Sequence, residues 1–219
     1  MSRRSALWFA LVLGLTLLVE LPASWLARAV ALPAEGVTGS LWRGQARQVA
    51  ELGPLSWRWQ PWRLRAQARL GYQGQDWEVQ LRGWPWDWHA QLQALGTRPD
   101  GVSAYRLAGR WKGVIRLQGA GRQCRDAQGR IRVDDLALVA PWSLGLGQGW
   151  LQVDCSKGWH LAGQLALAGQ HQAALDADLL ARRAQLDVEL QADAALLPVL
   201  RASGWLDTGT TRVQRLISW

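Results

Sequence analysis

The chain has 219 residues and a formal net charge of +8, from 25 basic and 17 acidic side chains. This length suffices for one domain of medium size beside a membrane anchor. No linker is long enough to divide that domain, which excludes a multidomain organisation. The charge is uneven, since residues 1–132 carry 19 basic and 8 acidic groups and residues 133–219 carry 6 and 9. A basic half suits contact with anionic headgroups, and a solvated arginine-rich surface explains it equally well.

The first predicted element is a membrane anchor. Arg3 and Arg4 precede a predominantly apolar stretch over residues 7–26. Twenty residues at about 1.5 Å each span about 30 Å, which matches one hydrocarbon core. Trp8 and Trp25 stand near its two ends, as interfacial aromatic residues do. The positive charge on the short N-terminal side predicts that this end stays in the cytoplasm.

The anchor also sets the predicted domain organisation. Residues 1–28 form the cytoplasmic tip and the transmembrane anchor, and residues 29–219 form one periplasmic β-domain. Glu20 interrupts the apolar stretch, where a carboxylate stays protonated, reaches the interface, pairs, or serves as a functional acid. The alternative is a cleaved signal peptide with its apolar region over residues 6–19. Its cleavage region would be long and bulky, so we expect an uncleaved anchor.

A dense group of tryptophan and arginine residues follows the anchor: Trp57, Arg58, Trp59, Trp62, Arg63 and Arg65. Such residues lie at the headgroup level of membranes, with guanidinium groups near the lipid phosphates. They also pack on sheets, with arginine stacked over tryptophan. Stacking on a sugar is a further alternative. Stacking on single-stranded nucleic acid is disfavoured, because the predicted topology places the group outside the cytoplasm. We expect a membrane-interface or docking cluster and no nucleic-acid partner.

Beyond residue 36, apolar side chains recur at every second position, which predicts strands. Glycine-containing turns separate the strands, so we expect about nine or ten of them in one largely antiparallel sheet. The clearest ranges are 64–72, 77–82, 150–155, 161–167, 175–179 and 186–190. One soluble helix is expected over residues 194–203. Many apolar positions hold alanine or glycine, so the apolar face is shallow and the sheet must fold on itself or curve into a trough.

The two cysteines of the chain, Cys124 and Cys155, predict one structural disulfide. An even number of cysteines in a domain outside the cytoplasm fits an oxidising compartment. Neither cysteine belongs to a C-x-x-C motif, and no histidine stands at ligand spacing from either. Closing a loop of this length would stabilise the fold by roughly 3–4 kcal/mol in the chain-entropy account.

Residues able to carry out chemistry are sparse. The candidates are three scattered histidines and two acidic pairs: His89, His160, His171, Asp176 with Asp178, and Asp187 with Glu189. The histidines have no ligand partners at metal spacing, and the acids alternate along strands, so we expect solvated or packing roles. The glycine-rich run over residues 145–149 lacks the lysine and helix of a phosphate loop and is expected to connect a hairpin. We expect no enzyme, metal or cofactor.

Three stretches resemble one known family. They are Leu21-Pro22-Ala23, the pattern V-x-G-x-L-W-x-G over residues 37–44, and the pattern L-S-W-x-W-x-P-W over residues 55–62. They resemble the start of the periplasmic part of the type II secretion system protein N family, accessory inner-membrane subunits of the machine that exports folded proteins across the outer membrane. The region that contains the stretches, residues 21–62, is about a fifth of the chain. The paired cysteines also look like those of the family.

The resemblance implies a non-enzymatic inner-membrane component of the type II secretion system, with a single membrane pass, whose partners are membrane lipid and other inner-membrane subunits. The family looks related to AsmA-like periplasmic proteins, whose sheets curl into half-open apolar grooves. The alternative is therefore an AsmA-like lipid-handling protein of envelope maintenance with a bound acyl chain. The expected fold is mainly β: an N-terminal transmembrane helix, a curved, largely antiparallel sheet forming a half-open groove, and one short C-terminal helix.

Overall fold

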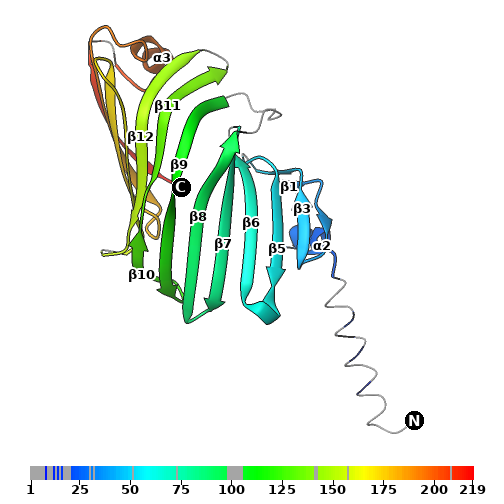
Figure 1. Ribbon diagram of the computed structural model, residues 1–219. Helices are drawn as coiled ribbons and strands as arrows, with labels where there is room; N and C mark the ends of the chain where they lie inside the picture. The colour runs from blue at the N-terminus through cyan, green and yellow to red at the C-terminus, as the bar shows by residue number, and fades with distance from the viewer. Residues whose placement is uncertain are drawn as a thin grey trace.

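The computed structural model describes residues 8, 12, 14, 16, 21–29, 31, 33–50, 52–72, 74–97, 106–140, 143–156, 158–207 and 209–219. These residues form a mainly β chain, as the alternation of apolar side chains predicts (Figure 1). The helical segments are α2 (Ala23–Ala29), the 3-10 turn η1 (Pro61–Arg63) and α3 (Leu197–Ala202).

The strands are short near the N-terminus and long in the middle of the chain. The first eight are β1 (Ala34–Glu35), β2 (Thr38–Gly39), β3 (Arg43–Ala46), β4 (Gln48–Val49), β5 (Leu55–Gln60), β6 (Arg65–Tyr72), β7 (Gln75–Trp84) and β8 (Asp87–Thr97). The others are β9 (Arg106–Ala120), β10 (Gln123–Gln128), β11 (Ile131–Ala140), β12 (Leu144–Asp154), β13 (His160–Leu167), β14 (His171–Asp178), β15 (Arg183–Leu190) and β16 (Arg212–Ser218).

Within the described residues, 14 of these strands form one antiparallel sheet, and β1 pairs with β4 beside it. The order across the sheet is β16-β15-β14-β13-β12-β11-β9-β8-β7-β6-β5-β3-β2, and β10 pairs with β9. The estimate of nine or ten strands was too low. It missed the very short N-terminal strands, because two to four residues give no readable alternation. It also missed the last strand, β16, in which the adjacent Leu216 and Ile217 break the alternation.

The sheet turns about its central strand, β9. The C-terminal half of β9 pairs with β8 and β10, whereas its N-terminal half pairs with β11. Gly113 and Gly129 stand at this change of partner with φ of +104° and +86°. A Cβ at Gly113 would overlap the carbonyl oxygen of Arg130, and one at Gly129 that of Val114, so only glycine permits this bend.

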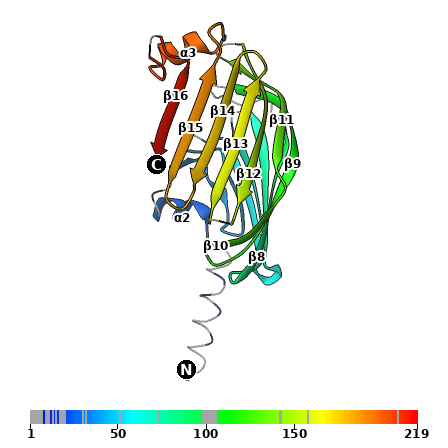
Figure 2. The ribbon, with the colours of Figure 1, turned by 90° about the vertical axis from the view of Figure 1, so that its left-hand side faces the viewer.

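The two halves of the sheet consequently face in different directions. Figure 1 looks onto β5–β9, whereas Figure 2, turned by 90°, looks onto β12–β16 with the first half behind them. Along each regular stretch, side chains two residues apart point to the same side. The register shifts in β11 change this parity, so that Val133 and Leu136 share a face. One cross-strand row of this face is Trp111, Val133, Gly149, Leu165, Ala173, Val188 and Val213. The equivalent row of the first half is Gly44, Trp57, Ala68, Val79, Leu92 and Ile115.

The C-terminal helix predicted over residues 194–203 is present as α3 but is shorter. Pro198 lies in its first turn, where its missing N–H group costs nothing, so the helix starts just before it. Leu197 of α3 packs with Val188 and Leu190 of β15 and with Leu206. The helix therefore covers one end of the apolar face.

Most of the predicted anchor, including Arg3, Arg4 and Glu20, lies outside the described residues. Among the residues that the structure describes, no helix is long and apolar enough to cross a bilayer. The end of the predicted span is also interrupted. Pro22 forms a β-bridge with Ser40, and α2 begins only at the next residue. A residue without an N–H group favours such a break.

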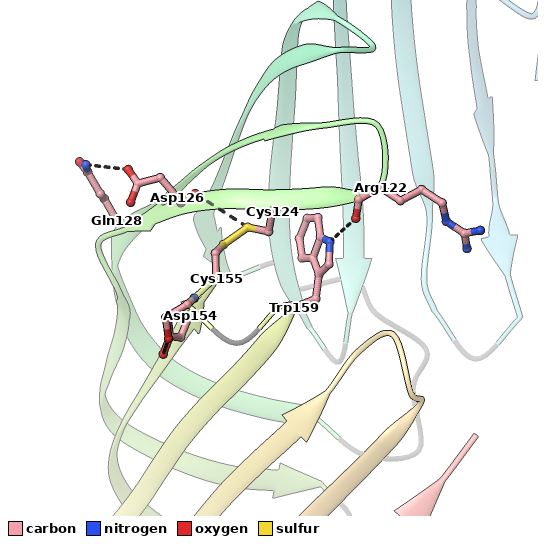
Figure 3. Close-up of a disulfide and its surroundings, with 8 residues drawn as sticks. Arg122, Cys124, Asp126, Gln128, Asp154, Cys155 and Trp159 are labelled. Atoms are coloured by element: carbon pink, nitrogen blue, oxygen red, sulfur yellow. Dashed lines mark hydrogen bonds between the residues drawn. A yellow bond between two sulfur atoms is a disulfide. The ribbon is translucent and has the colours of Figure 1, made fainter.

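The predicted disulfide is confirmed. Cys124 on β10 is bonded to Cys155, which follows β12, with the two Cα atoms 5.3 Å apart (Figure 3). Beside it, the indole N–H of Trp159 donates a hydrogen bond to the carbonyl oxygen of Arg122 at 2.7 Å. The bond and the indole together attach the β9–β10 hairpin to the β12–β13 turn, on the two sides of the bend.

Removing the disulfide should destabilise the fold without unfolding it. We predict that the double variant Cys124→Ser/Cys155→Ser loses roughly 3–4 kcal/mol of unfolding free energy, because the unfolded chain gains entropy. Urea unfolding of the wild type, with and without reductant, measures this loss, and the variant should not respond to reductant. Two free thiols in the denatured, non-reduced wild type would contradict the prediction.

Candidate functional site

The apolar side of the second half of the sheet carries a cavity of about 220 Å³. Its main lining side chains come from β9 and β11–β15: Trp111, Leu136, Leu151, Leu165, Leu175 and Leu186. Gly149 and Gly163 belong to the same face and also line the cavity. A Cβ at Gly163 would lie 2.7 Å from the Leu151 side chain, so this leucine fills the space over the glycine. The volume falls below the roughly 300–1,000 Å³ of small-molecule pockets, so it fits part of an extended apolar chain.

Two packed clusters bound this cavity. At the bend, Ile115, Ile131 and Val153 are buried together, with the disulfide and Trp159 beside them. At the other end, α3 packs on β15, as described above. The floor between the clusters is only partly buried. Trp111 adds a buried indole N–H without a hydrogen-bond partner among the described residues, a defect that costs about 1–3 kcal/mol.

The apolar side of the first half of the sheet is more open. Trp59, Val79 and Leu81 stay 43%, 40% and 42% exposed, although they belong to the same face as the buried Ile115. Large contiguous patches of exposed apolar surface often mark interaction sites. The candidate site is therefore the whole apolar face, which includes the cavity.

The opposite side of the first half is polar and centred on Glu78. This carboxylate is buried and accepts hydrogen bonds from Gln67, Arg69, Gln80 and Gln93 at 2.5, 3.0, 2.9 and 2.8 Å. Burial alone would raise the pKa of the carboxyl. The four side-chain donors outweigh burial and lower this pKa from 4.5 to about 2. Since every donor comes from strands β6–β8, Glu78 holds their register.

The lowered pKa makes stability depend on pH. The ionised Glu78 stabilises the fold above the unfolded-state pKa of 4.5, and this contribution is lost as the pH falls towards about 2. The shift corresponds to roughly 3 kcal/mol. We predict that Glu78→Gln is less stable than the wild type at pH 7 and loses less stability on acidification. Urea unfolding from about pH 7 to pH 3 measures this, with the exposed Glu189→Gln as control. Equal acid sensitivity of Glu78→Gln and the wild type would contradict the prediction.

The predicted Trp/Arg cluster does not form one surface. Because side chains alternate along β5 and β6, Trp57 and Trp59 belong to the apolar face, whereas Arg58 and Arg65 belong to the polar face. The remaining two residues, Trp62 and Arg63, are exposed in η1 at the end of the sheet. Alternation over six residues separates what the linear sequence brings together.

Trp57 has a packing role. Its indole N–H donates to the carbonyl oxygen of Leu41 at 3.1 Å. Its ring lies over Gly44, where a Cβ would overlap it. The neighbouring pair of Trp42 and Trp59 has ring centroids 5.2 Å apart. The N–H group of Leu41 in turn donates to the carbonyl oxygen of Leu21 at 3.1 Å. The three stretches that carry the family resemblance thus contact one another, and we call them the entry unit (residues 21–23, 37–44 and 55–62).

The titratable residues considered for catalysis are separated. His171 is buried, with Nε2 3.2 Å from the carbonyl oxygen of Leu146. His160 lies 3.8 Å from Asp176 on the polar face. Asp178 accepts the N–H groups that close the β14–β15 turn. Within the described residues, no group of three or more His, Cys, Asp or Glu side chains is placed to hold a metal ion.

The sequence predicted that the glycine-rich run over residues 145–149 connects a hairpin. This prediction is wrong, because the run is part of β12. Gly147 has φ of +87° and lies opposite Leu136 at a shift in register between β11 and β12. Gly149 lines the cavity. The sequence pattern does not indicate Trp111 and Leu136 as lining residues, because their positions depend on how β9, β11 and β12 pair, with a shift in register at Leu136.

No family model, curated protein or solved structure matches this chain.

Proposed function

We propose that this chain is a non-enzymatic inner-membrane component of the type II secretion system, where it supports the export of folded proteins across the outer membrane. The observation that carries the proposal is the entry unit. Its residues come from three separate stretches and meet in one packed structure, so their spacing is a requirement of the fold. Gly44, for example, must be glycine because the Trp57 ring occupies the position of a Cβ.

The chain would act by contact. Its largest unusual feature is an apolar sheet face that stays partly exposed, shaped as a half-open groove by the turn at β9. Such a face is suited to receive an apolar segment of another subunit of the system. The disulfide and the Glu78 network stabilise the two halves of the sheet and hold this face in shape. The periplasmic side of the inner membrane would be the location of the domain.

Deleting the gene should abolish the export of folded enzymes and leave the outer membrane impermeable to detergents and large antibiotics.

In complementation of the deletion strain, we predict that Val79→Asp, on the exposed part of the apolar face, restores export at least tenfold less well than Ala166→Asp on the polar face. The charge on Val79 must be desolvated when a partner binds, which costs several kcal/mol. Protein levels from immunoblots control for folding. Full export in the deletion strain would overturn the proposal.

A second function, periplasmic lipid handling, is favoured by the cavity alone. Its lining side chains are almost entirely apolar, and its size suits part of an acyl chain. In this case the outer membrane of the deletion strain would become permeable to detergents and large antibiotics, while the export of folded enzymes would continue. Phospholipid would also copurify with the protein after detergent removal.

A cavity-filling variant tests the lipid function. Ala173 lines the cavity, whereas Ala166 lies on the opposite face of the neighbouring strand. We predict under this function that Ala173→Trp lowers binding of a dansylated undecanoic acid at least fivefold, and that Ala166→Trp does not. Fluorescence titration measures binding, and circular dichroism checks both folds. Equal binding by the two variants would exclude the cavity as a lipid site.

A further inference from the structure

Several turns meet at one end of the sheet and are linked by hydrogen bonds. The N–H group of Gly83, next to the β7–β8 turn, donates to the carbonyl oxygen of Leu64, which ends η1, at 3.0 Å. The N–H group of Gly121, in the β9–β10 turn, donates to the carbonyl oxygen of Pro85 at 2.6 Å. These turns lie side by side at the lower end of the sheet in Figure 1. They form one continuous edge.

The tips of these turns expose large aromatic side chains. Trp62, Trp84 and Trp86 remain 73%, 51% and 63% exposed, and the rings of Trp84 and Trp86 stack with centroids 4.9 Å apart. Trp88 of β8, two residues after Trp86, behaves differently. Its indole N–H donates to the carbonyl oxygen of Gly121, and its ring stacks on Trp159. Trp88 therefore packs within the fold, whereas the three exposed tryptophans face solvent.

The same edge is basic. Exposed arginines stand in or beside the turns: Arg63, Arg65, Arg82 and Arg122. The acidic residues near this end include Asp87, which receives a hydrogen bond from Gln118, Asp126, which receives one from Gln128, and Asp154, which receives two from Ser156. Indole and guanidinium groups together match the headgroup region of a bilayer, where amphipathic rings are enriched and phosphate oxygens accept from arginine. We call these three tryptophans and four arginines the rim.

The chain enters the sheet at this end. The β2–β3 turn, residues 40–42, lies beside η1, because the N–H group of Trp59 donates to the carbonyl oxygen of Trp42 at 2.6 Å. The N–H group of Leu41 in that turn donates a hydrogen bond to the carbonyl oxygen of Leu21, just before α2. Trp25 of α2 is also exposed. A segment that leaves a membrane through α2 would therefore deliver the rim, and not the α3 end, to the bilayer surface.

We propose that the rim rests in the headgroup layer of the bilayer, with Trp62, Trp84 and Trp86 among the headgroups and the arginines on lipid phosphates. The strands then stand away from the membrane, and α3 is the end farthest from it. Arginine contacts with anionic lipid add to the tryptophan contribution. The proposal rests on the inner-membrane location proposed above, but not on the role in secretion.

A depth measurement on the full chain tests this orientation. An environment-sensitive nitrobenzoxadiazole label is attached to Trp86→Cys at the rim, and to Ala168→Cys in the β13–β14 turn at the opposite end. Labelling is done without reductant, so Cys124 and Cys155 stay bonded. The proteins are reconstituted in vesicles of phosphatidylcholine and phosphatidylglycerol, and circular dichroism confirms their folds. Quenching by lipids with a nitroxide near the headgroup is then compared.

We expect the label at position 86 to be quenched at least threefold more strongly than the label at position 168. Replacing Arg63 and Arg82 by Gln should lower quenching at position 86 in the anionic vesicles. Equal, weak quenching at both positions would overturn the proposal. Shielding at position 86 in native membranes but not in pure lipid would also overturn it, because a protein would then cover the rim. Either failure leaves the export phenotype of the deletion strain as a separate test of the secretion role.

Discussion

The rest of this structure depends on one constraint. The large sheet has an apolar face that must be buried, and almost no helix covers it. In ordinary domains a second layer buries such a face. In the described part of this chain, α3 covers only the end of β15, and α2 lies at the opposite edge, beside β2. The sheet therefore turns on itself at β9, where Gly113 and Gly129 accept a backbone conformation that other residues resist. Even so, the face is buried only near the bend and under α3.

Because the face is incompletely buried, the disulfide and side-chain hydrogen bonds stabilise the parts of the sheet that lack apolar packing. The disulfide lies at the bend, where it joins a hairpin of the first half to a turn of the second. Glu78 holds the strands of the first half from their polar side, where the apolar side gives little packing energy because Val79 and Leu81 remain exposed. The same exposure is what makes the face available for binding. In the first half, the Glu78 contacts and the proposed binding surface thus lie on opposite sides of the sheet.

Much of the fold could be predicted from the sequence, because alternation is a local signal. The strands around residues 64–72 and 161–167 followed from it, whereas the disulfide followed from the two cysteines of the chain and the short helix from the segment over residues 194–203. The candidate site could be predicted only in outline. The cavity needs Leu136 and Gly149 to meet across a shift in register, which no local pattern encodes. The Trp/Arg cluster appeared as one unit because its residues are adjacent in sequence, whereas the pleat assigns them to two faces and the edge.

The apolar face of the first half is open, whereas α3 closes the end of the apolar face of the second half, over β15. Thiol labelling of the folded protein, with Cys124 and Cys155 bonded, tests this difference most directly. A cysteine in place of Val79, 40% exposed, should react with a maleimide at a rate close to that of an unfolded control. A cysteine in place of Val188, 7% exposed, should react at least a hundredfold more slowly. Equal protection of both positions would mean that the face is closed throughout, and would contradict this account.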